Sequence, residues 1–95
     1  MVKFDWDPEK NEFLKRERDI SFEELALLLA TGRLWKTTAH PNQRKYSNQR
    51  VFLVPVDGYI YFVPYVLDGE TIFLKTAFPH RKATQDFLKE KKKDE

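Results

Sequence analysis

The sequence has no cysteine, only two histidines and no long apolar run, and each shortage excludes a class of protein. Without cysteine the chain forms neither a disulfide nor a thiolate metal site, and His40 and His80 are too few for a metal cage. No stretch reaches the roughly 18 apolar residues of a membrane span, and the opening MVKFDWDPEK lacks the apolar core of a secretory signal. We therefore expect a cytoplasmic protein that uses no metal, no cofactor and no membrane.

The length and the composition predict one domain. A chain of 95 residues, 41% hydrophobic and 15% aromatic, is long enough to bury a single core but not two. We expect this domain to span residues 1–95, with residues 89–95 as a frayed basic tail. The net charge of +2 argues only weakly for a polyanionic partner, although bases gather toward the C-terminal end and acids before Leu25.

Two helices are predicted in the first third of the chain, after a short strand with the sequence VKFDW. Asp7 is a typical N-cap and Pro8 suits the first helical position, so the first helix should run to about Arg16. The second helix should follow Ser21, which has capping-box spacing to Glu24, with Ile20 and Leu25 as a hydrophobic staple. Gly32 supplies a left-handed stop.

An antiparallel meander is predicted for the second half of the chain. A strand at 34–38 and a polar loop at 39–49 precede three strand-like runs, RVFLVPV, YIYFVPYVL and TIFLKTAF, which are joined at Asp57-Gly58 and Asp68-Gly69. Because alternate residues share a face, we expect Phe78 to lie on the same face as Tyr61 and Leu74. Pro55 and Pro64 donate no ladder hydrogen bond, so each should lie at a bulge or an open edge.

The expected fold is α+β, with two N-terminal helices packed on an antiparallel β-meander sheet and a C-terminal helix closing it. That last helix should run from about Pro79 to Lys91. Both faces of the meander are largely apolar, so helices should cover most of the sheet.

Cations crowd the joint between the last strand and the last helix, in the stretch PHRK. A helix start already carries partial positive charge, so Arg81 and Lys82 there indicate an anion such as phosphate. His80 has suitable chemistry for proton transfer, and Lys75 interrupts an apolar strand. The alternatives are a solvated helix end for the first three residues and an edge-strand charge for Lys75.

The basic loop and the tyrosines each allow two interpretations. His40, Arg44, Lys45 and Arg50 either guide a nucleic-acid backbone or bind an acidic segment of a protein. Tyr59, Tyr61 and Tyr65 either stack on splayed RNA bases or belong to the core, with Tyr61 and Tyr65 as the candidates for RNA contact. Trp6 and Trp35 are predicted to be core residues.

The order of these segments resembles the BrnT branch of the RelE-like toxins. The likeness runs over about residues 4–88 and rests on FDWDPEKN, ISFEEL, HPNQRKY, VDGYIYFVPYVLDGETIFLKT and RKAT. It implies a RelE-like fold and a bacterial ribonuclease toxin, neutralised by a small antitoxin through which the complex binds operator DNA. The chain has RERDI where familiar members have KHG, and Lys75-Thr76 where many have an arginine in the last strand.

The sequence thus predicts a metal-independent endoribonuclease of a type II toxin–antitoxin module. In this hypothesis Arg81 stabilises phosphate charge, Lys75 and Arg50 position phosphate, and His80 or Tyr61 transfers a proton. Additional RNA contacts are expected from Lys82, Arg44 and Tyr65. The alternatives are an inactive RNA- or antitoxin-binding module of the same fold, favoured by the missing KHG histidine and strand arginine, and a protein–protein adaptor.

Overall fold

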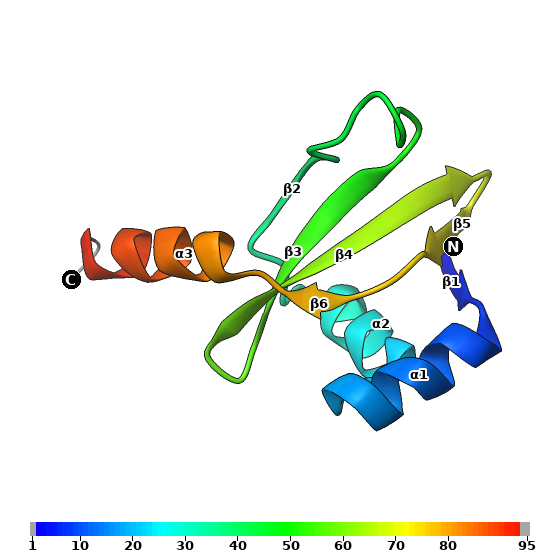
Figure 1. Cartoon of the computed structure of the whole chain (residues 1–95), viewed down its shortest axis with the longest axis horizontal. Helices are drawn as coiled ribbons and strands as arrows, with labels where there is room; N and C mark the ends of the chain where they lie inside the picture. Colours follow the sequence, from blue (N-terminus) through cyan, green and yellow to red (C-terminus); the bar gives the residue numbers. More distant parts are fainter. Residues whose placement is uncertain (1, 94–95) are drawn as a thin grey trace.

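A six-stranded sheet forms the centre of the molecule in the computed structural model, which describes residues 2–93 (Figure 1). The strand order is β1-β5-β4-β3-β2, and β6 pairs with β4. The strands are β1 (Lys3–Trp6), β2 (Lys36–Ala39), β3 (Arg50–Val56), β4 (Tyr59–Asp68), β5 (Thr71–Leu74) and β6 (Phe78–Pro79). The helices are α1 (Pro8–Arg18), α2 (Phe22–Ala30) and α3 (Arg81–Lys93). The expected α+β class is confirmed.

The two predicted hairpins are present, one of them with a shifted turn. Val56 pairs with Tyr59 across a loop of Asp57 and Gly58, whose φ angles of 49° and 85° suit a two-residue hairpin. In the second hairpin Asp68 pairs with Thr71, so the loop is Gly69–Glu70 rather than Asp68-Gly69. Gly69 has a φ of 60°, which explains why the turn begins at this glycine.

The sheet is mixed, so the expectation of a purely antiparallel sheet is wrong. β1 pairs parallel to β5, with Phe4 opposite Ile72 and Trp6 opposite Leu74. This pairing brings the two aromatic rings of β1 to the sheet face that α1 and α2 cover, where both pack against the core. Parallel strands cannot be joined by a tight hairpin and need a long connection. Between β1 and β5 the chain passes through α1, α2 and the strands β2 to β4, which provides that connection.

A one-residue offset separates β5 from β6, and it overturns the predicted position of Phe78. Tyr65 is opposite Leu74, but Phe62 is opposite Phe78, so the segment 75–77 contains one residue more than the strand it faces. Phe78 therefore lies on the face of Phe62 and not on that of Tyr61.

The two strand prolines explain where the ladder is interrupted. Pro64 has no N–H to donate, and it lies where β5 ends, although its carbonyl still accepts from the Lys75 amide at 2.8 Å. In β3, Leu53 is the last residue that pairs with β2, and Pro55 lies two residues beyond it. Both prolines thus occupy the bulge and edge positions that the sequence predicts.

The predicted helix caps are confirmed. The Asp7 carboxylate accepts from the Glu9 amide at 2.9 Å, and the Ser21 hydroxyl accepts from the Glu24 amide at 3.1 Å. α1 ends at Arg18, two residues later than expected. After α2, Gly32 at a φ of 79° forms the expected left-handed stop.

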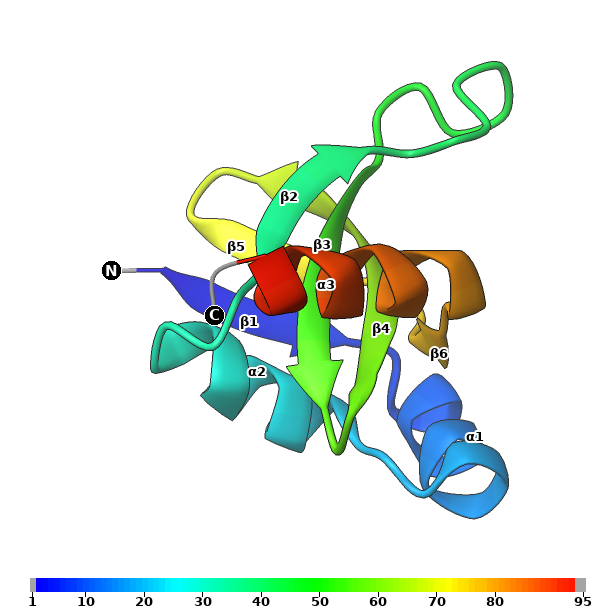
Figure 2. The ribbon, with the colours of Figure 1, turned by 90° about the vertical axis from the view of Figure 1, so that its left-hand side faces the viewer.

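Helices cover both faces of the sheet, with α1 and α2 on one face and α3 in front of β3 and β4 on the other (Figure 2). The larger core joins the two N-terminal helices to the sheet through Leu14, Phe22, Leu25, Val54, Val63 and Leu74. The smaller core lies under α3 and contains Val51, Leu53, Ile60, Phe62 and Ala83. α3 extends beyond the sheet at its C-terminal end (Figure 1).

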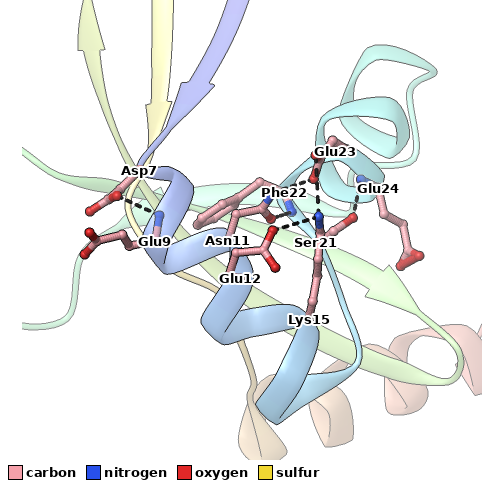
Figure 3. Close-up of polar contacts among 9 residues, drawn as sticks. All are labelled: Asp7, Glu9, Asn11, Glu12, Lys15, Ser21, Phe22, Glu23 and Glu24. Atoms are coloured by element: carbon pink, nitrogen blue, oxygen red, sulfur yellow. Dashed lines mark hydrogen bonds and ion pairs between the residues drawn. The ribbon is translucent and has the colours of Figure 1, made fainter.

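Asn11 joins the two N-terminal helices (Figure 3). Its side chain is 4% exposed; its oxygen accepts from the Phe22 amide at 2.8 Å, and its NH2 group donates to Glu23 at 2.6 Å. The bond from Asn11 is the first cause that lowers the pKa of the Glu23 carboxyl. Nothing in the sequence marks this residue, because Asn11 lies in an ordinary polar stretch one helical turn after Pro8.

Asn11→Ala should lower the free energy of unfolding by about 1–3 kcal/mol, because the buried Phe22 N–H loses its acceptor. Urea unfolding followed by circular dichroism measures the change. Asn48→Ala is the control, since Asn48 is an exposed loop residue. Equal stability of the two variants would contradict the role given to Asn11.

Candidate nucleic-acid interface

His80 is the N-cap of α3, and its hydrogen bonds link that helix to the sheet. Its amide donates to the Ile60 carbonyl at 2.9 Å, while its Nδ1 accepts from the Ala83 amide at 3.1 Å. Its own carbonyl accepts from the Thr84 amide at 3.0 Å. An imidazole thus serves as the capping side chain, a part usually taken by serine, threonine, aspartate or asparagine.

Thr84 completes the joint between β4 and α3. Its side-chain hydroxyl accepts from the Ile60 amide at 2.9 Å and donates to the His80 carbonyl at 2.7 Å. Thr84 is 7% exposed, so these bonds form away from water. The first turn of α3 therefore has a fixed position relative to β4, and with it the imidazole of His80.

His40 begins the loop that connects β2 to β3, and this loop is held by bonds within itself. The Asn42 amide donates to His40 Nδ1 at 3.1 Å, and the Gln43 side chain donates to the His40 carbonyl at 2.6 Å. The Tyr46 amide donates to the Asn42 carbonyl at 2.9 Å. The ring of Tyr46 then lies 4.5 Å from that of His40, between centroids.

Both histidines contact the ring of Phe62 on the α3 face of the sheet. The His80 ring stacks on Phe62 with centroids 4.8 Å apart, and the His40 ring meets it edge-on at 6.4 Å. Phe78 stacks on the same ring at 5.3 Å, as a result of the offset that precedes β6. We call His40, Tyr46, Phe62, Phe78 and His80 the histidine cluster.

The two histidines have the same hydrogen-bonding state. Because Nδ1 of each ring accepts from a backbone amide, the neutral ring carries its proton on Nε2. Each ring therefore offers an N–H donor, and Nε2 becomes an acceptor only in the other tautomer, in which the Nδ1 bond is broken and the ring proton lies on Nδ1. In the observed arrangement both are suited to bind an anionic oxygen.

Exposed cations follow the histidines in the chain. Arg81 and Lys82 form the first turn of α3, next to His80, and Lys45 lies over the Tyr46 ring at 5.3 Å. Within residues 2–93 Arg81 and Arg44 form no ion pair, whereas Lys82 pairs with Asp86 at 3.3 Å. Arg81 and the 40–49 loop thus keep positive charge available for an anion.

Lys75 lies on the same sheet face but in a different setting. By the β4–β5 register this face includes Phe73, and the Lys75 ammonium lies 5.2 Å from the centre of the Phe73 ring. The side chain of Lys75 is exposed. Lys75 therefore adds an exposed positive charge to the sheet face on which the histidine cluster lies.

Three of the predicted site residues lie on the other face of the sheet. Tyr61 belongs to the face that α1 and α2 cover, and Arg50 and Tyr65 share that face by register. Tyr65 is 6% exposed and stacks on Phe52, with centroids 3.8 Å apart. Its ring is part of the core and is not open to an RNA base.

The environment of Tyr61 keeps its phenol protonated. Burial is the first cause that raises its pKa above the ordinary value of 10.0, and the negative charges of Asp57 and Glu24 raise it further. A tyrosine of raised pKa on the opposite face is not placed to exchange a proton at the histidine cluster.

The sequence does not predict that His40 and His80 contact the same ring. The two residues lie 40 positions apart, and the ring that both contact belongs to Phe62, which has the sequence pattern of an ordinary core residue in a strand. No spacing or periodicity reports such a contact, because it depends on the path of the 40–49 loop and on the offset before β6.

Thr84→Val should lower the free energy of unfolding by about 1–3 kcal/mol, because the buried Ile60 N–H loses its acceptor. Valine has nearly the same side-chain shape as threonine, so packing is kept. Amide hydrogen exchange at Ile60 should also accelerate. Thr84→Ser retains the hydroxyl and should keep most of the protection. Slow exchange in the valine variant would show that the hydroxyl does not hold Ile60.

Tyr61→Phe should reduce the loss of stability at high pH. Folding raises the pKa of Tyr61, so the unfolded chain loses this phenol proton at lower pH than the folded protein does. Tyr61 therefore does not change the free energy of unfolding below a pH of about 10, and it lowers that free energy as the pH rises toward the pKa of the folded protein. Thermal unfolding of the parent and the variant at pH of about 8 and 11 measures the difference. An identical alkaline loss in both proteins would contradict the raised pKa.

Within residues 2–93 no three metal-binding side chains gather at one place, and no helix has the length and apolar character needed to span a membrane. Comparisons of the chain with protein-family models, with curated proteins and with solved structures found no match.

Proposed function

We propose that the protein is a metal-independent endoribonuclease toxin with a RelE-like fold, as its resemblance to the BrnT branch implies. The observation that supports this most directly is the histidine cluster, where two imidazoles contact one aromatic ring beside unpaired cations. Imidazole, guanidinium and ammonium groups together are sufficient for RNA cleavage without a metal. Aromatic rings beside cations also suit a single-stranded, unstacked substrate.

Phosphate charge is stabilised at the start of α3 in this proposal. The Ala83 amide is taken by His80, which leaves the amides of Arg81 and Lys82 at the end of the helix dipole. The Arg81 guanidinium adds two donors in a plane that matches two phosphate oxygens. Nε2–H of His80 is a further donor beside them.

His40 is the better candidate for the base that activates the 2′-hydroxyl. To accept a proton on Nε2, a ring must first release its Nδ1 bond and carry its own proton on Nδ1 instead of Nε2. For His80 that release removes the cap of α3, whereas for His40 it breaks one bond to the Asn42 amide in an exposed loop. We therefore assign proton acceptance to His40 and hydrogen-bond donation to His80.

The proposal includes an antitoxin that neutralises the protein and carries the complex to operator DNA. A partner that covers the 40–49 loop or the start of α3 would block RNA at the same place.

A second candidate is a binding module of the same fold that retains RNA or antitoxin contacts without cleavage. The observation that favours it is the occupied Nδ1 of both histidines, which leaves no free imidazole base in the observed arrangement. The module and the enzyme differ in turnover but not in the surface they use.

Arg81→Ala should abolish RNA cleavage and growth inhibition while leaving the melting temperature unchanged, because an exposed cation at a helix start contributes little to stability. Arg81→Lys should keep part of the activity, since it retains charge without the two-point contact. His40→Gln should stop cleavage and spare RNA binding.

Cleavage of a mixed RNA and RNA binding are measured in the presence of a chelator, with Arg16→Ala as the control on α1. Arg16 is exposed and pairs only with its neighbour Glu17 among residues 2–93. Full cleavage by Arg81→Ala would remove Arg81 from the site. Binding without cleavage in the parent would favour the inactive module.

A further inference from the structure

An apolar groove lies between the end of α2 and the middle of α3, and no residue of the histidine cluster lines it. It has a volume of about 350 Å³ and is lined by Leu28, Arg33, Leu34, Trp35, Pro55 and Phe87. A second hollow of about 270 Å³ continues across Trp35 and Phe87 to Glu90 and Lys91. Phe87 is six residues beyond Arg81, which is about 9 Å along a helix axis.

The floor of the groove is a pair of aromatic rings that the fold leaves partly uncovered. Trp35 and Phe87 meet edge to face with centroids 5.2 Å apart, and both are only half-buried. The aliphatic wall beside them is open too, because Leu34 is 37% exposed. Contiguous exposed apolar surface of this kind is typical of an interaction site.

The rim of the groove is positively charged. Lys36 lies over Trp35 at 4.2 Å and Lys91 lies over Phe87 at 5.9 Å. Glu90, the one acid that lines either hollow within residues 2–93, pairs with Lys36 at 4.0 Å. Arg33 and Lys91 form no ion pair in that part of the chain, so their charge is open to a partner.

We infer that this groove binds an acidic amphipathic segment of a partner protein. Apolar side chains of such a segment would cover Trp35 and Phe87, while its carboxylates would meet Arg33 and Lys91. Tryptophan and arginine are among the residues on which binding energy concentrates at interfaces, and the groove offers Trp35 at its floor and Arg33 at its rim. The opposite charges would also orient the segment and speed its association.

Two other occupants fit the groove less well. An RNA base would find rings to stack on in Trp35 and Phe87, but the aliphatic walls of Leu28, Leu34 and Pro55 offer no donors or acceptors to base edges and match apolar side chains of a peptide better. A second copy of the chain would offer the carboxylates of Glu23 and Glu24 in the first turn of its α2. Glu23 already accepts a hydrogen bond from Asn11, so it is less available to Arg33 and Lys91 than a carboxylate of a separate acidic segment. The inference does not rest on the ribonuclease proposal, because it uses a different surface.

The test uses two synthetic helical peptides of about 14 residues. One has leucine at positions i, i+3, i+4 and i+7 and glutamate elsewhere, and its twin has glutamine in place of glutamate. Two-dimensional NMR of the full chain should show a shift of the Trp35 indole N–H, with the Trp6 indole unmoved. The acidic peptide should bind at least tenfold more tightly than its twin.

Charge reversal on the chain provides the matched comparison. Arg33→Glu with Lys91→Glu should lower the affinity for the acidic peptide at least tenfold. Lys3→Glu with Arg16→Glu changes the net charge equally at exposed positions of β1 and α1, and should change the affinity less than threefold. Thermal unfolding of both double variants checks that the fold is intact, and the milder Arg33→Gln with Lys91→Gln should give an intermediate loss.

Each remaining outcome contradicts the inference in a distinguishable way. Equal affinity for both peptides, or an equal loss in both double variants, would leave no role for the charged rim. A dimer that Arg33→Glu with Lys91→Glu dissociates would assign the groove to a second copy, and an RNA oligonucleotide that shifts the Trp35 indole would assign it to nucleic acid. RNA cleavage by that double variant should equal the parent's, so failure here is separate from failure of the ribonuclease proposal.

Discussion

The exchange of hydrogen bonds between Ile60 and the first turn of α3 is the constraint on which both candidate surfaces depend. Ile60 is fully buried, so its amide and its carbonyl must find partners inside the protein. Thr84 and His80 supply them. This fixes the start of α3 on β4, which stacks the His80 ring on Phe62 and, two helical turns later, brings Phe87 against Trp35. Loss of these bonds would therefore disturb the histidine cluster and the groove together.

Pro64 contributes to the same arrangement from the middle of the sheet. A proline in a central strand removes one ladder bond, and β5 ends where that bond would be missing. The extra residue in the segment 75–77 then turns Phe78 to the face of Phe62, where the two rings stack. A defect in the regular sheet thus produces the aromatic surface on which both histidines rest.

Local signals in the sequence were sufficient for the parts of the fold that short-range chemistry determines. Asp7 and Ser21 begin helices because their side chains satisfy amides a few residues away, and Asp57-Gly58 forms a hairpin because it accepts positive φ. The parallel pairing of β1, the offset before β6 and the contact of His40 with Phe62 depend on residues far apart in the chain. Strand alternation divides the predicted site: Lys75 follows Leu74 and so lies on the face of Phe62 and His80, while Tyr61, Tyr65 and Arg50 lie on the other face.

The two histidines differ in what the fold requires of them, although their hydrogen bonds look alike. Nδ1 of His80 caps α3, so a ring that gained a proton there would lose the Ala83 amide and face the positive end of the helix dipole. Nδ1 of His40 holds only one turn of an exposed loop, and its ring also rests against Tyr46. Breaking the Nδ1 bond therefore disturbs the α3 joint at His80 and only a loop at His40. This asymmetry favours a division of labour in which the rigid imidazole positions an anion and the less constrained one exchanges a proton.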